Sequence, residues 1–299
     1  MPGNDHRERS FYRIGYTAGA FEFLSRAAER LGRKGSGLIG RTAGRFYAAT
    51  NPGIVDVIRR NLEILENRPF SRKEAARMFE TYGLTLADYL WMGSRAPGDG
   101  FAMADLDGGI ENIRGAMENG RGAILVTGHF GFFEFGALVL GHMGLPVSVV
   151  TYAEPSPELT RWRADFRRRW GAETIELGAD SFSSLRVNQA LEDGRLTAML
   201  VDRPVGGRSL DVALPGGSIA FSMSPAILSW MTGCAIIPVT AWRTPAGRYA
   251  IRGGTPIVCD RSKPRNEEIE ATTRRMAATL VEAFRADPLQ WYQFVPLQS

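Results

Sequence analysis

The feature that most constrains the fold is a regular alternation of short apolar runs with helical stretches, which begins after Arg121. Residues 123–126 (Ala-Ile-Leu-Val) form an apolar run that is typical of a buried strand, and this run ends at Thr127-Gly128. An apolar helical stretch follows at residues 132–140, and a second strand-like run at residues 146–151. A strand, a turn, a helix and a strand in this order predict two parallel strands joined by a right-handed crossover.

The same alternation continues toward the C-terminus, whereas the first hundred residues are mostly helical. Helices are predicted at residues 10–31, 51–67, 71–82, 84–92, 159–170, 183–192, 223–231 and 267–284, with a glycine-rich loop or weak helix at 32–44. Strands are predicted at 174–177, 196–201 and 235–240, with edge strands at 249–252 and 257–258. We therefore expect the α/β class, with a mixed, largely parallel central sheet flanked by helices and a helical N-terminal layer. Residues 1–100 are expected to pack on a core formed by residues 101–299, within one structural domain.

Composition narrows the class of protein further. The chain has 299 residues, of which 44% are hydrophobic and 23% charged, so it can bury a substantial core. Its two cysteines argue against a disulfide framework and against a zinc site with four cysteine ligands, and they fit a reducing compartment. No apolar stretch is long enough to span a membrane, and the charged first ten residues lack the apolar centre of a signal peptide. The sequence therefore predicts a cytoplasmic protein.

The charge of the chain suits an anionic partner. The formal net charge is +4, and only Lys34, Lys73 and Lys263 among the 36 basic residues are lysines. Arginine binds phosphate and carboxylate groups through its planar guanidinium. A GC-rich genome explains the same arginine content, and net charge does not distinguish a nucleic acid, a membrane or an acidic carrier.

The first predicted helix has an apolar stripe that allows two interpretations. The stripe consists of residues at helical spacing: Phe11, Ile14, Ala18, Phe21, Leu24, Ala28 and Leu31. This face either packs on the core or lies in a membrane interface, which its aromatic and basic composition would allow.

The strongest chemical signal is His129, which follows a predicted buried strand, together with Glu134 five residues later. Ligands bind at the carboxyl ends of parallel strands in α/β sheets. A carboxylate on one imidazole nitrogen fixes the tautomer and leaves the other nitrogen free to accept a proton. Four phenylalanines surround the pair, and this apolar setting suits a long-chain substrate: Phe130, Phe132, Phe133 and Phe135. No third metal ligand accompanies the pair, so no metal site is expected.

At this point the sequence resembles a known family. His129-x4-Glu134 is similar to the signature of the late lipid A (lauroyl/myristoyl) acyltransferases, within the lysophospholipid and glycerolipid acyltransferase superfamily. Three further segments resemble this family in the same order: residues 201–206 (Val-Asp-Arg-Pro-Val-Gly), residues 221–238 and Pro288-x-Gln290-Trp291. One departure is that such enzymes usually begin with a hydrophobic membrane anchor, which this sequence lacks.

The resemblance implies transfer of an acyl group from a thioester to a hydroxyl or amine of an amphiphilic acceptor. His129 would be the general base and Glu134 would orient its imidazole. Backbone N–H groups near Gly131, or an arginine, would stabilise the oxyanion. The donor would be acyl-coenzyme A or an acylated acyl carrier protein, with no bound cofactor and no nucleic-acid partner. The enzyme would act at the cytoplasmic face of the inner membrane, as a peripheral protein.

Substrate contacts are expected from further residues near this motif. Phe130 and Phe133 suit an acyl chain, and Arg167, in the most basic segment of the chain, matches an arginine of the family that precedes a glycine. Asp202 would either position Arg167 or Arg203 or cap its own loop.

Other functions remain open at this stage. A lysolipid or another small molecule of the same superfamily is an alternative acceptor. Ser218 within Gly216-Gly217-Ser218 approximates the nucleophile turn of a serine lipid hydrolase, although no strand is predicted before it. A lipid-binding module without catalysis is the remaining alternative.

Overall fold

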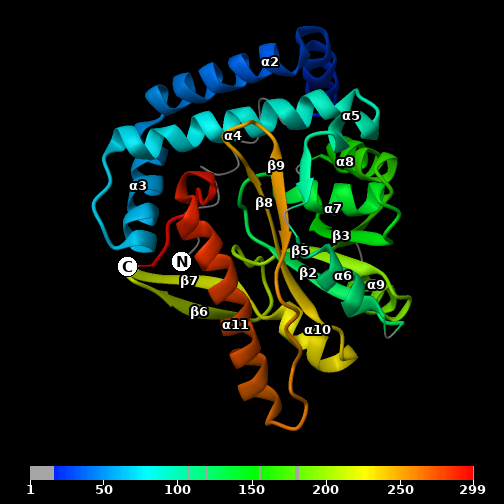
Figure 1. The fold of residues 1–299 in the computed structure, drawn as a ribbon. Helices are drawn as coiled ribbons and strands as arrows, with labels where there is room; N and C mark the ends of the chain where they lie inside the picture. Colours follow the sequence, from blue (N-terminus) through cyan, green and yellow to red (C-terminus); the bar gives the residue numbers. More distant parts are fainter. Residues whose placement is uncertain (1–16, 107, 119, 155, 179–181, 299) are drawn as a thin grey trace.

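The computed structural model describes residues 17–298 except 107, 119, 155 and 179–181, and it has the predicted α/β fold (Figure 1). A seven-stranded sheet has the strand order β1-β9-β8-β2-β5-β3-β4, and neighbours are parallel except β8 and β9. Its strands are β1 (Ala104–Leu106), β2 (Ala123–Thr127), β3 (Val147–Tyr152), β4 (Ala172–Leu177), β5 (Leu196–Leu200), β8 (Ile236–Arg243) and β9 (Tyr249–Gly253). A separate antiparallel hairpin consists of β6 (Ser209–Leu214) and β7 (Gly217–Ser222).

Helices cover both faces of this sheet, as its alternating apolar side chains require. Ala123 and Leu125 of β2 belong to one hydrophobic cluster, while Ile124 and Val126 belong to another. The first face carries α4 (Arg72–Gly93), α6 (Ile110–Met117), α7 (Phe133–His142) and α8 (Pro157–Arg169). The second face carries the hairpin together with α9 (Ser183–Glu192), α10 (Ser224–Thr232) and α11 (Arg265–Ala286). The remaining helices are α2 (Ala18–Thr50), α3 (Pro52–Glu66) and α5 (Pro97–Phe101).

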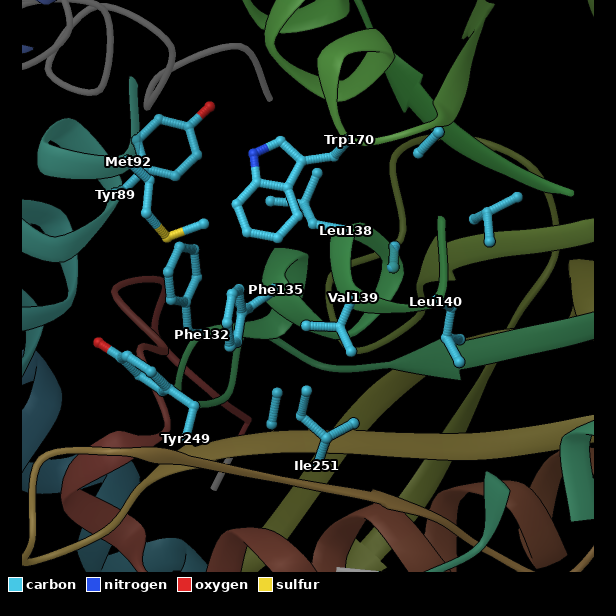
Figure 2. Close-up of a cluster of buried hydrophobic side chains, with 14 of the residues drawn as sticks. Tyr89, Met92, Phe132, Phe135, Leu138, Val139, Leu140, Trp170, Tyr249 and Ile251 are labelled. Atoms are coloured by element: carbon cyan, nitrogen blue, oxygen red, sulfur yellow. The ribbon is translucent and has the colours of Figure 1, made fainter. Parts of the chain in front are cut away.

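Aromatic side chains join the helical N-terminal layer to the sheet. Figure 2 shows Tyr89 and Met92 of α4 meeting Phe132 and Phe135 next to Tyr249 of β9. The rings of Phe132 and Phe135 are stacked with their centroids 5.2 Å apart, and the edge of the Tyr249 ring packs against each of them. This packing fixes the start of α7 against α4 and β9.

The glycine-rich segment at residues 32–44, for which a loop or a weak helix was expected, is helical. It is part of α2, which bends at Gly32 (φ 69°) and then lies along α4 (Figure 1). A Cβ built on Gly40 would overlap the carbonyl oxygen of Gly83 in α4, and one on Gly44 would overlap that of Phe79. Glycine therefore allows the two backbones to pack closer than any other residue would, and this packing outweighs its low helix propensity.

Other expectations are confirmed or refined. Ser71 and Glu74 form the predicted capping box, but residues 71–82 and 84–92 belong to the single helix α4. The strand predicted at 249–252 is β9, an interior strand between β8 and β1. Phe21 and Ala28 of the first apolar stripe are buried, whereas Leu24 and Leu31 are exposed; Phe11 and Ile14 lie outside the described residues. No helix within the described ranges combines the length and the hydropathy needed to cross a bilayer.

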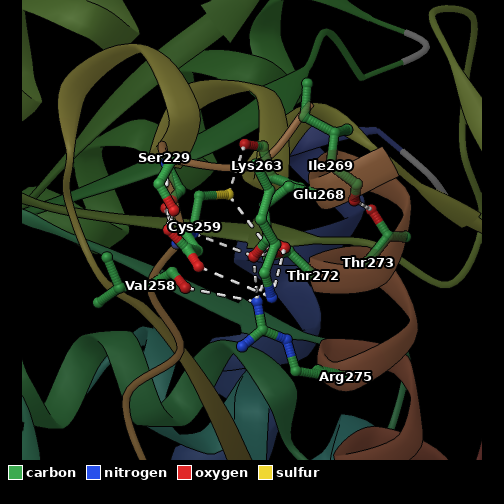
Figure 3. Close-up of polar contacts among 12 residues, drawn as sticks. Ser229, Val258, Cys259, Lys263, Glu268, Ile269, Thr272, Thr273 and Arg275 are labelled. Atoms are coloured by element: carbon green, nitrogen blue, oxygen red, sulfur yellow. Dashed lines mark hydrogen bonds and ion pairs between the residues drawn. The ribbon is translucent and has the colours of Figure 1, made fainter. Parts of the chain in front are cut away.

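A polar network fixes the beginning of α11 against the segment that precedes it (Figure 3). Buried Glu268 accepts hydrogen bonds from the backbone N–H of Asp260, from Thr272 Oγ1 and from Arg275 Nη2, the last at 2.6 Å. The pKa of the Glu268 carboxyl is lowered, first by the Asp260 N–H. These contacts hold the helix that places the C-terminal segment near the sheet edge described next.

Candidate active site

The site begins where β2 and β5, two neighbouring parallel strands, end at the same edge of the sheet. Thr127 of β2 pairs with Leu200 of β5, and each strand is followed two residues later by an ionisable side chain, His129 and Asp202. His129 Nδ1 is 2.8 Å from Asp202 Oδ1, and the backbone N–H of His129 donates to Asp202 Oδ2 at 2.9 Å. The parallel register therefore brings an imidazole and a carboxylate together.

Asp202 is held as a carboxylate although it is buried. Trp291 Nε1 donates a third hydrogen bond to it, at 3.0 Å from Oδ2. Burial by itself raises the pKa of Asp202, but the charge and hydrogen bond of His129, the charge of Arg203 and the Trp291 N–H outweigh this and lower the pKa to about 2. In the neutral imidazole, Nδ1–H donates a hydrogen bond to ionised Asp202, which leaves Nε2 of His129 as the nitrogen that can accept a proton.

The imidazole lies at a cavity of about 280 Å³ above the ends of β2, β3 and β5. The side chain of His129 keeps 21% of its surface exposed, whereas the Asp202 side chain has none. Apolar residues line one part of the cavity: Phe133, Ala137, Val149, Val150, Ala198, Met199, Leu200 and Phe294. Charged residues line another part: Glu134, Glu154, Arg163, Arg167 and Arg203. The cavity thus presents an apolar surface and cationic groups to the same ligand.

Glu134 lies in the first turn of α7 and contacts an arginine, so the expectation that it orients His129 is corrected. Glu134 Oε1 accepts a hydrogen bond from Arg167 Nε at 2.7 Å, and both side chains are more than nine-tenths buried. Arg167 Nη1 also donates to Thr174 Oγ1 at 3.4 Å. Within the described part of the chain no hydrogen bond joins Glu134 to His129. The carboxylate that contacts the imidazole is Asp202, so it does not act only as a loop cap. No hydrogen bond or ion pair among the described residues joins it to Arg167 or Arg203.

The backbone N–H groups around Gly131 are already in use. Those of Phe130, Gly131 and Phe132 donate to the carbonyl oxygens of Gly128, Gln290 and Ala241 at 2.7–2.8 Å. Gly131 itself has φ 56°, and a Cβ there would overlap the Ala241 carbonyl. Its role is to let the turn approach β8, and the N–H groups of residues 130–132 are not free to bind an oxyanion.

Comparison with known proteins identifies the family of the chain. Residues 18–297 match the family described as bacterial lipid A biosynthesis acyltransferases. The chain belongs to this family. It is 24% identical over 265 residues to a phosphatidylinositol mannoside acyltransferase of Mycolicibacterium smegmatis. The aligned region covers 85% of this chain and 82% of that protein. It is 22% identical over 191 residues to the protein of the same name from Mycobacterium tuberculosis. This aligned region covers 63% of this chain and 58% of that relative. The chain thus spans less than two thirds of the length of the M. tuberculosis relative.

The residues predicted from the acyltransferase resemblance do not all face the cavity. His129, Phe133, Glu134, Arg167 and Arg203 line it. Phe130 is buried against Phe284 on the other side of the sheet, and neither it nor Gly131 lines the cavity. Ser218 lies within β7 of the hairpin, and its backbone N–H donates to the Gln298 carbonyl. Ser218 is therefore not at a turn between a strand and a helix, as a hydrolase nucleophile would be.

Sequence reasoning missed several residues of the site. Trp291 was noted only as part of a family motif, although its indole N–H contacts Asp202. The backbone N–H of Tyr292 donates to the His129 carbonyl at 2.7 Å, and Tyr82 of α4 lines the cavity beside the Tyr292 ring. No local sequence pattern predicts that Tyr82 and Tyr292 lie at the site, because only the tertiary fold brings them there.

Proposed function

We propose that this protein is a lipid acyltransferase that moves a fatty acyl group from a thioester to a hydroxyl of an amphiphilic acceptor, with His129 as general base. The single observation that carries the proposal is the bond between His129 Nδ1 and ionised Asp202 at the mouth of a partly apolar cavity. Family membership supports the same reaction class.

The reaction follows from the free nitrogen of the imidazole. His129 Nε2 removes the proton of the acceptor hydroxyl while its oxygen attacks the thioester carbonyl. The resulting imidazolium is stabilised by Asp202, as in other His–carboxylate pairs. When the tetrahedral intermediate collapses, the C–S bond breaks and the thiolate takes the proton from His129. The products are the acyl ester and the free thiol.

The oxyanion of this intermediate needs a hydrogen-bond donor. Because the N–H groups of residues 130–132 are occupied, we assign this role to an arginine of the cavity wall, Arg203. Its Nε donates to Gln293 Oε1 at 3.1 Å and its Nη2 to the Tyr292 carbonyl at 2.9 Å. These bonds hold the guanidinium at the wall of the cavity that His129 also lines. The backbone N–H of Tyr292 in turn donates to the His129 carbonyl.

The acceptor that fits this chain best is a glycolipid. The two relatives are named for acylation of phosphatidylinositol mannoside, an anionic lipid that carries sugar hydroxyls. In the cavity, Glu134 paired with Arg167 and Glu154 paired with Arg163 offer polar groups to a sugar. The apolar wall that starts at Phe133 offers a surface to an acyl chain. The donor is acyl-coenzyme A or an acylated carrier protein.

The test is acyl transfer by purified protein, with mass spectrometry of the lipids after incubation with acyl-coenzyme A and a phosphatidylinositol mannoside. His129→Ala is expected to lower the rate by about 10²–10⁴-fold, because the general base is lost. Asp202→Asn is expected to lower the rate and to change its pH dependence, since an amide cannot stabilise the imidazolium. Glu134→Gln should leave the shape of the pH profile unchanged.

Ser218→Ala is the matched control, because Ser218 is remote from the cavity and is the nucleophile of the hydrolase alternative. Wild-type transfer by His129→Ala would overturn the proposal. Release of free fatty acid in place of an acylated lipid, abolished by Ser218→Ala, would establish the hydrolase instead.

A further inference from the structure

The second half of α2 carries a row of exposed apolar side chains. Leu38, Ile39 and Phe46 are 67%, 54% and 70% exposed, although each is large enough to be buried in a core. Phe46 follows Ile39 by seven residues and Leu38 by eight, so all three lie on one side of the helix. The opposite side faces α4 through Gly40 and Gly44.

A row of cations borders this apolar row. Lys34, Arg41 and Arg45 are spaced by seven and four residues, which places them on one side of α2 next to Leu38. Arg45 is paired with Glu80 of α4, but Lys34 and Arg41 have no ion pair with any described residue. Residues 33–50 contain no aspartate or glutamate. The outer face of α2 is therefore apolar along one side and positively charged along the other.

The cationic side opens into a second cavity, of about 340 Å³, between α2, α4 and the turn that joins β8 to β9. Four cations line it, Arg33, Lys34, Arg41 and Arg243, and no described lining residue is acidic. Asp88 of α4 binds Arg33 through two hydrogen bonds and lies 3.7 Å from Arg243 Nε. Asp88 thus neutralises part of this charge while it positions both guanidinium groups beside the cavity.

We propose that the outer face of α2 docks on an anionic lipid bilayer, with this second cavity receiving a lipid phosphate. Leu38, Ile39 and Phe46 would enter the boundary between headgroups and acyl chains, while Lys34 and Arg41 contact the anionic headgroups. The apolar row beside the cations favours a bilayer, because a bilayer offers acyl chains and anionic headgroups along one surface. The glycine contacts with α4 hold the face in one orientation before it docks.

Docking through α2 brings the bilayer near the proposed catalytic cavity. Tyr82 and Leu84, two residues apart on α4, line the catalytic cavity and the cationic cavity respectively. One helix therefore separates the membrane surface from the place where a lipid acceptor would react. Membrane docking through α2 rests on the proposed acyltransferase function. Because vesicle binding is measured without acyl transfer, docking and acyl transfer can each be disproved separately.

The test is flotation of the full-length chain with vesicles of phosphatidylcholine, alone or mixed with phosphatidylglycerol. The wild-type protein is expected to float only with the anionic vesicles. Lys34→Glu combined with Arg41→Glu should lower the partition coefficient by at least about tenfold, since each basic residue contributes about fivefold near an anionic surface. Leu38→Ser combined with Phe46→Ser should lower it similarly.

Matched controls come from α10, at the other end of the molecule (Figure 1), and from the loop before α11. Met231→Ser removes an exposed apolar side chain and Arg261→Glu reverses an exposed charge, and both should float as the wild type does. Circular dichroism establishes that each variant is folded. Equal flotation of the α2 variants and the wild type, or wild-type flotation with neutral vesicles alone, would overturn the proposal. A dimer in light scattering that Leu38→Ser with Phe46→Ser dissociates would assign the face to a second copy and overturn it as well.

Discussion

At the scale of single residues, the local pattern identified the histidine at the strand end but not the carboxylate that contacts it. His129 was predicted because a histidine at the end of a buried strand lies where α/β sheets bind ligands. Glu134 was chosen as its partner because it is near in sequence. The actual partner, Asp202, is 73 residues away, and only the pairing of β2 with β5 brings it to His129. Strand order depends on the whole sheet, so it cannot be predicted from the residue spacing within one motif.

The buried carboxylate leads to a prediction about stability and pH. Asp202 has a folded-state pKa of about 2, whereas an unfolded aspartate titrates near 3.9. The lower folded pKa stabilises the protein above about pH 4, and this contribution is lost as the pH falls through about 2. The difference corresponds to about 2–3 kcal/mol. Urea unfolding between pH 5 and pH 2 should therefore show a shallower fall in the free energy of unfolding for Asp202→Asn than for the wild type. Parallel curves would contradict the ion pair.

At the scale of elements, the sequence left a loop and a weak helix open where packing outweighs local propensity. Repeated glycines lower the helix propensity of residues 32–44, and this is why a loop or weak helix was expected there. In the structure two of these glycines, Gly40 and Gly44, meet α4 at Gly83 and Phe79, where any side chain would collide with backbone. The central strands β2, β3 and β5 were easier to predict, because their apolar runs need no information about a distant partner.

The contact between α2 and α4 predicts a strong effect for a small substitution. Gly83→Ala adds a methyl group where the carbonyl oxygen of Gly40 lies, so the two helices must separate. We expect a loss of about 1–3 kcal/mol in the free energy of unfolding, as for other overpacked cores. Gly53→Ala in α3 is the matched control, because a Cβ there meets no atom within 4 Å. That variant should be neutral or slightly stabilising. Equal urea midpoints for the two variants would mean that the helices do not pack this closely.

At the scale of the whole molecule, the C-terminal segment joins parts of the fold that the sheet does not connect. Gln290 accepts from the Gly131 N–H, Trp291 donates to Asp202, and Gln298 accepts from Ser218 in the hairpin. Asn61 of α3 holds the same segment from the side of the helical layer. The sequence identified a motif at 288–291 through a family resemblance, but it did not indicate where that motif lies in the fold. The reason is that Gly131, Asp202, Ser218 and Asn61 are all distant in sequence from the segment that they hold.

Asn61 of α3 joins the helical layer to the C-terminal segment and is therefore expected to stabilise the fold. Its Nδ2 donates to the carbonyls of Gln293 and Val295 at 2.8 and 2.9 Å, and its Oδ1 accepts from the Leu297 N–H at 2.9 Å. Asn61→Ala would leave these backbone groups without their partner. We expect the free energy of unfolding to fall by about 2–3 kcal/mol, because buried polar groups are costly to leave unpaired.

The matched control for this variant is Asn188→Ala in α9. Asn188 donates a single exposed hydrogen bond to Glu192 one turn away, so its loss should change the free energy of unfolding by no more than about 0.5 kcal/mol. Urea unfolding of both variants measures the difference. Because the segment that Asn61 holds also carries Trp291 and Tyr292 to the catalytic end of the sheet, the acyl-transfer rate of Asn61→Ala should fall before global unfolding on heating. A variant as stable and as active as Asn188→Ala would show that the segment is fixed from the sheet side alone.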